Sequence, residues 1–96
     1  MLQLIFQSPL ESDLFSRFSV GDDIVFLENA LFFLLKKGRF NLELSRLQEK
    51  YKLYVLKDEL AVRGINSDEL VQGINVIDYT QFVQLTVTNQ LSYSWT

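Results

Sequence analysis

Three acidic residues of this 96-residue chain follow apolar stretches that are typical of buried strands: Glu28, Asp58 and Asp78. The carboxyl ends of parallel strands meet at one edge of a sheet, so these three carboxylates are expected near one another. Carboxylates in that position can hold Mg²⁺ or carry out acid–base chemistry. Each one also stands where a helix is expected to begin, and capping and the helix dipole favour acids there. Capping is the interpretation that we prefer.

The residue types on which most catalytic sites depend are missing from the chain. It contains no cysteine and no histidine, which excludes a thiolate nucleophile, a persulfide carrier, Ser-His or Cys-His catalysis and a zinc site within it. Its four glycines are scattered, so no glycine-rich phosphate loop is present. Arg63, beside Gly64, is a candidate for phosphate contact, but a surface arginine that ends a helical turn is the commoner case. We expect no catalytic residue, no metal site and no cofactor.

Length and composition indicate one small domain, residues 1–96, with an unusual supply of apolar side chains. Apolar residues make up 48% of the chain and aromatic residues 14%. A small domain that cannot hide all of its apolar surface is expected to cover the surplus with a partner, the alternative being a well-filled monomeric core. The net charge of −3 argues against autonomous binding of nucleic acid. With neither a signal peptide nor a run of about 20 apolar residues, a soluble cytoplasmic protein is expected, with no membrane contact.

Strands and helices are expected to alternate along the chain. The spacing of apolar residues predicts strands over 2–6, 23–27, 52–56 and 73–77, and helices over 9–18, 28–37, 41–51 and 58–64. The segment 77–87 carries β-branched residues that favour a strand. However, a crossover is needed after the fourth strand, and Asp78 or Thr80 is a natural N-cap, so we predict a helix there. The order indicates an α/β fold in which a small parallel sheet of about four strands is flanked by helices.

The predicted helix 28–37 is apolar nearly all round, which is typical of a helix buried on more than one side. On a helical wheel one stripe would face the sheet, and Phe32 and Phe33 lie off that stripe, toward Lys36. We expect them to contact a partner, the alternative being a neighbouring helix of the same chain. In the C-terminal "LSYSWT", Tyr93 and Trp95 alternate with polar residues. This segment is expected to add an edge strand, to cross a partner surface or to pack on the chain's own sheet edge. The candidate partner interface is therefore Phe32, Phe33, Lys36, Tyr93 and Trp95.

Several stretches together resemble a known family. A short strand leads into "SP", "GDDIVFLENAL" and "YVLKDELAVRGI" follow, then "INVIDYTQFVQLTV", and a tryptophan stands next to last. In order and spacing these stretches are similar to the TusB/DsrH family, over essentially the whole chain. The segment from Ser67 to Gly73 is longer and less typical of that family.

The resemblance implies a DsrE-like α/β fold and a heterohexamer, a dimer of heterotrimers formed with TusC-like and TusD-like sister subunits. Such a complex passes persulfide sulfur toward 2-thiouridine at the tRNA wobble position. In that branch the relay cysteine belongs to the TusD-type subunit, whereas some DsrH-type members carry a cysteine of their own. The related complex of sulfur-oxidising organisms serves dissimilatory sulfur metabolism. The absence of cysteine here argues against direct sulfur carriage, and it favours the tRNA-thiolation branch, or a purely structural role, over this sulfur-oxidation branch. A non-catalytic subunit is expected, which would form a homo-oligomer in isolation if its partner surfaces pair with themselves. The alternative is a stand-alone binding or enzymatic domain that uses the strand-end carboxylates.

Overall fold

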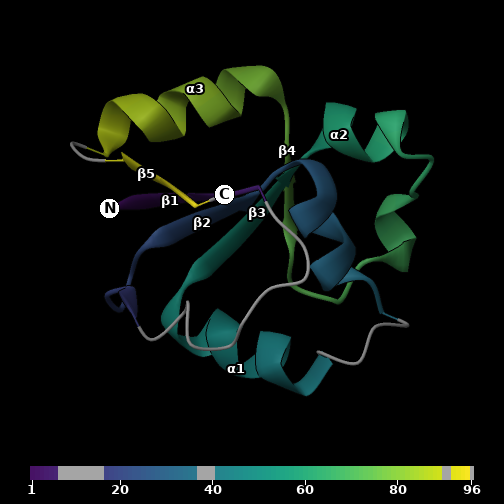
Figure 1. The fold of residues 1–96 in the computed structure, drawn as a ribbon, viewed down its shortest axis with the longest axis horizontal. Helices are drawn as coiled ribbons and strands as arrows, with labels where there is room; N and C mark the ends of the chain where they lie inside the picture. Colours follow the sequence, from purple (N-terminus) through teal and green to yellow (C-terminus); the bar gives the residue numbers. More distant parts are fainter. Residues whose placement is uncertain (7–16, 37–40, 90–91, 96) are drawn as a thin grey trace.

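The chain forms a parallel sheet of five strands in the order β4-β3-β2-β1-β5 (Figure 1). The computed structural model describes residues 1–6, 17–36, 41–89 and 92–95. The strands are β1 (Leu2–Ile5), β2 (Asp23–Phe26), β3 (Lys52–Leu56), β4 (Asn75–Ile77) and β5 (Ser92–Trp95). Every neighbouring pair is parallel, which confirms the predicted α/β class.

The sheet has five strands, whereas about four were predicted, and the additional strand is β5. β5 pairs with β1 in parallel, with Tyr93 opposite Gln3 and Trp95 opposite Ile5. The C-terminal segment therefore extends the chain's own sheet at the free edge of β1. An edge strand is covered less than a central one, so it tolerates the serines that alternate with the aromatic residues. This composition is the reason why the segment does not look like the other strands.

In the part of the chain that the structure describes, α-helices and short 3₁₀-helices connect the strands. The α-helices are α1 (Asn41–Lys50), α2 (Lys57–Val62) and α3 (Tyr79–Thr88), and the 3₁₀-helices are η2 (Glu28–Leu34) and η3 (Ser67–Glu69). The prediction of a helix after Ile77 is confirmed, with Asp78 as its N-cap. Most of the helix expected over 9–18 lies outside the described residues.

The segment after β2 is a 3₁₀-helix, and the prediction of an α-helix over 28–37 was wrong. Contacts at both of its ends account for the difference. The Leu27 N–H donates to the Ile5 carbonyl (2.8 Å), and the Lys36 N–H donates to the Glu69 carbonyl (2.8 Å). A 3₁₀-helix rises about 2.0 Å per residue against about 1.5 Å in an α-helix, so it spans a longer gap with the same residues. Tertiary attachment thus overrides the local helical preference.

The two faces of the sheet are covered unequally. One face carries the larger core cluster, with side chains from η2, α1 and α2, whereas α3 lies on the opposite face (Figure 1). The smaller cluster has only three buried members among the described residues, namely Leu2, Val25 and Leu27. Phe82 and Leu85 of α3 pack against it and are themselves only partly buried. The outer layer on the α3 side is therefore thin.

Candidate partner-binding surface

The side chains of η2 follow a three-residue repeat. Ala30 and Phe33 are buried, as are Leu31 and Leu34, whereas Phe32 is 42% exposed. A 3₁₀-helix has three residues per turn, so residues i and i+3 share a face. This repeat puts Phe33 on the same inward face as Ala30, and the helical wheel drawn for an α-helix misplaces it.

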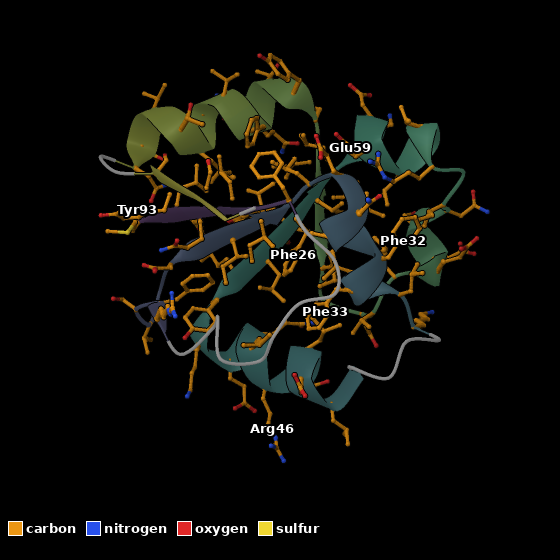
Figure 2. All side chains as sticks on the ribbon, in the orientation of Figure 1. Phe26, Phe32, Phe33, Arg46, Glu59 and Tyr93 are labelled. Atoms are coloured by element: carbon orange, nitrogen blue, oxygen red, sulfur yellow. The ribbon has the colours of Figure 1, made fainter. Side chains whose placement is uncertain are left out.

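Phe33 belongs to the core of the chain itself. It is 5% exposed, and its ring stacks on Phe26 with the centroids 6.0 Å apart and an interplanar angle of 21°. The sequence predicted Phe33 on an exposed partner surface, but in the structure its ring is buried in the core. Phe32, by contrast, remains a large exposed ring on the outer side of η2 (Figure 2).

Lys36 lies just beyond η2, at a hollow of about 360 Å³ that is lined by Leu35, Lys36, Asp68 and Glu69. An isolated antiparallel β-bridge pairs Leu35, which lines this hollow, with Leu70. The Val71 N–H donates to the Leu34 carbonyl (2.8 Å), which attaches the end of η2 to the segment after η3. The exposed Phe32 and this charged hollow together are called the η2 surface below.

Tyr93 lies on the edge strand and away from the η2 surface. It is 51% exposed and lines a second hollow of about 310 Å³, together with Met1, Gln3, Arg17, Ser19 and Asp22. The side chain of Trp95 lies outside the described part of the structure. Figure 2 shows Phe32 and Tyr93 on opposite sides of the molecule, so the predicted residues do not form one patch.

A buried polar cluster beneath Tyr93 was not predicted from the sequence. Asp22, only 5% exposed, accepts hydrogen bonds from the Ser19 N–H (3.0 Å) and the Gln3 amide (3.2 Å), and its other oxygen lies 3.4 Å from the Met1 ammonium. Burial alone would raise the pKa of Asp22, but these hydrogen bonds and the ammonium charge hold it below its usual value of 3.8. The cluster ties β1 to the turn before β2. Its sequence signal, an acid just before an apolar strand, looks the same as that of an ordinary turn.

Of the three strand-end carboxylates, Asp78 caps a helix, whereas α2 and η2 begin without a side-chain cap hydrogen bond. The Asp78 carboxylate accepts from the Gln81 N–H (2.8 Å), and the Gln81 side chain accepts from the Asp78 N–H (3.0 Å), which completes a capping box. Asp58 lies in the first turn of α2, and Glu28 begins η2 with φ 52°. Within the described residues no three carboxylates gather into a group that could hold a metal ion. Arg63, the phosphate candidate, pairs with Glu59 one turn away.

No helix in the described part of the chain is long and apolar enough to cross a membrane. The exposed residues of the predicted interface lie in two separate places, the η2 surface and the Tyr93 edge.

Comparison with known proteins supports the arrangement seen here. The family model described as DsrH like protein matches residues 7–92. The chain is 35% identical to the protein TusB of Buchnera aphidicola subsp. Baizongia pistaciae and 32% identical to the protein TusB of Escherichia coli strain K12, covering 99% of this chain and 100% of each relative. A protein of unknown function from Methanobacterium thermoautotrophicum, MTH1491, has the same fold, with a TM-score of 0.77 at 15% identity, over 98% of this chain and 97% of that one. The chain therefore belongs to the DsrH-like family.

Proposed function

We propose that this chain is a non-catalytic subunit of a sulfur-relay complex that passes persulfide sulfur toward 2-thiouridine at the wobble position of tRNA. One observation supports this role above the others: relatives named TusB match 99% of the chain at 32–35% identity. The chain has no cysteine, so it cannot itself carry a persulfide. The sulfur would pass through the cysteine of a sister subunit.

The role of this subunit in the proposed complex is to bind and position its partners. An exposed aromatic ring beside charged groups is typical of an interface, in which the ring is the anchor and the charges form the rim. Phe32 is such a ring, and Lys36 with Asp68 and Glu69 supplies charges of both signs nearby. Phe33 supports this surface from beneath, by holding η2 on the sheet through Phe26. Tyr93 and Trp95, on the opposite edge, are proposed to contact a different neighbour.

The proposal is tested by measuring thiolation of tRNA in a strain that lacks this chain. We expect 2-thiouridine to fall strongly in hydrolysed tRNA when the gene is deleted, and to return when the wild-type chain is supplied. The Phe32→Asp variant should restore it poorly, because a carboxylate would replace the anchor ring. Leu42→Asp is the matched control, since Leu42 is 79% exposed and belongs to α1 rather than to η2. Unchanged 2-thiouridine in the deletion strain would overturn the proposed function.

A further inference from the structure

The 3₁₀-helix η2 has a backbone that its own sequence does not favour. It runs for seven residues, whereas 3₁₀-helices longer than three or four residues are uncommon, because their hydrogen-bond geometry is poorer than that of an α-helix. Its first residue, Glu28, has a φ of 52°, in the left-handed region that costs energy for a residue with a side chain. Glutamate, alanine and leucine, which η2 contains, are strong α-helix formers. The extended form of η2 is therefore strained locally and must be held by contacts elsewhere.

A short antiparallel contact holds the C-terminal end of η2. Two backbone hydrogen bonds of 2.8 Å and the β-bridge between them join six residues, which we call the clasp: Leu34, Leu35, Lys36, Glu69, Leu70 and Val71. As an α-helix the seven residues of η2 would be about 10.5 Å long instead of about 14 Å. Because η2 starts at the end of β2, a contraction of about 3.5 Å would draw its last residues away from the other half of the clasp. Helix type and clasp closure are thus coupled.

The two forms of η2 bury comparable apolar side chains. In the 3₁₀-helix Phe33 is 5% exposed, and Leu35 is only partly buried. With 3.6 residues per turn, an α-helix would place Leu35 in one stripe with Leu31 and turn Phe33 to the outer side, next to Phe32. Leu35 would then take the inward place that Phe33 leaves. The exchange of one large apolar side chain for another lowers the cost of changing the helix type.

The half of the clasp that follows η3 is lightly attached. η3 has only three residues, no side-chain cap and no buried residue. Within residues 66–71 only Leu70 is buried. The hollow of about 360 Å³ lies between the two halves of the clasp, since Leu35 and Lys36 line it from one side and Asp68 and Glu69 from the other. The two segments are therefore incompletely packed against each other, which is typical of an element that opens locally.

We propose that η2 is a two-state element controlled by the clasp. While the clasp is closed, η2 is a 3₁₀-helix with Phe33 in the core, and the η2 surface presents one ring, Phe32. When the clasp opens, η2 becomes an α-helix, and the surface presents two adjacent rings. A partner that binds both rings selects the open form. This use rests on the proposed function, whereas the two forms belong to the chain itself and are tested on the purified chain alone.

A pair of histidines reports the α-helical form, because the natural chain has no histidine or cysteine that would bind metal. Phe32→His and Lys36→His together place two imidazoles four residues apart, which are neighbours on an α-helix. In the closed form the 3₁₀ repeat and the extended backbone of Leu35 (φ −72°, ψ 138°) separate them. Imidazole is a good ligand of Zn²⁺, so Zn²⁺ should bind the double variant and draw it into the open form. The two single variants are the controls, and they should bind Zn²⁺ at least about tenfold more weakly.

Hydrogen exchange shows whether metal binding opens the clasp. Saturating Zn²⁺ should speed exchange of the amides of residue 36 and Val71 at least about tenfold in the double variant, because both N–H groups lose their carbonyl acceptors. The amide of Val55, in the buried strand β3, should exchange at an unchanged rate. Equal acceleration at Val55 would mean that the clasp opens only by global unfolding, which would overturn the proposal. Zn²⁺ binding without any change at the two clasp amides would overturn it as well.

A disulfide across the clasp is the decisive test. Leu35 and Leu70 form a non-hydrogen-bonded antiparallel pair, in which Cα atoms lie about 4.5 Å apart, within the range of a disulfide. In the two-histidine variant, oxidised Leu35→Cys/Leu70→Cys should weaken Zn²⁺ binding at least about tenfold by keeping the clasp closed, whereas Leu35→Ala/Leu70→Ala, the control without a crosslink, should not. Equal Zn²⁺ affinity with and without the disulfide, or no Zn²⁺ binding by the two-histidine variant, would overturn the two-state element. Either result would leave the proposed function standing, since that is tested by thiolation of tRNA.

Discussion

Replacing Phe33 and Phe32 separately by alanine tests the three-residue repeat of η2 directly. The two residues are adjacent and chemically identical, but Phe33 is 5% exposed and stacked on Phe26, whereas Phe32 is 42% exposed. Truncating a buried phenylalanine costs about 3–5 kcal/mol, through the lost transfer free energy and the cavity left behind. Truncating the half-exposed ring should cost about 1 kcal/mol, because much of its surface already contacts water.

The free energy of unfolding should be measured by urea denaturation at 25 °C, followed by far-UV circular dichroism. A domain of this size has a free energy of unfolding of about 5–15 kcal/mol. Phe33→Ala is therefore expected to leave a protein that is only marginally stable but whose unfolding can still be measured. Since 1 kcal/mol shifts the Tm of such a domain by about 4–8 °C, thermal melting provides an independent check. Equal losses for the two variants, or a larger loss for Phe32→Ala, would refute the 3₁₀ register and restore the α-helical wheel.

Other predictions concern caps, backbone strain and pH. Asp78→Ala should destabilise the chain by about 1 kcal/mol through loss of the capping box, with Thr80→Ala as a control in the same turn; an unchanged urea midpoint would contradict this. Glu28→Gly should stabilise it by up to about 1 kcal/mol, because φ 52° is costly for a side chain, and Gly64→Ala, at φ 67°, should do the reverse in the same assay. The pKa of Asp22 is lowered on folding, so its stabilisation is present above the unfolded pKa of 3.8 and is lost as pH falls through the folded pKa. Asp22→Asn should therefore flatten the acid limb of the stability–pH curve below about pH 5; an equally steep limb in the variant would count against the cluster.

Much of the fold follows from local patterns, and the exceptions have physical causes. The strand at Lys52–Leu56 and the helix that Asp78 caps are both marked by neighbouring residues, so the sequence predicts them well. The geometry of η2 depends instead on hydrogen bonds to distant segments at both of its ends, which no local pattern encodes. β5 resembles an exposed tail because only its backbone pairing with β1 makes it a strand.

The candidate sites were predictable to different degrees. Phe32 and Tyr93, two residues of the predicted interface, are exposed, whereas the placement of Phe33 required the correct helix type. The Asp22 cluster could not be predicted, since it joins residues that are 19 positions apart and its burial depends on the sheet.

The most direct test of the central claim, that this chain is a subunit held by partners, is co-expression with TusC-like and TusD-like proteins, followed by size-exclusion chromatography with light scattering. We predict co-elution of all three chains at the mass of a heterohexamer, and loss of that species with Phe32→Asp but not with Leu42→Asp. A wild-type chain that elutes alone, without either protein, would contradict the account.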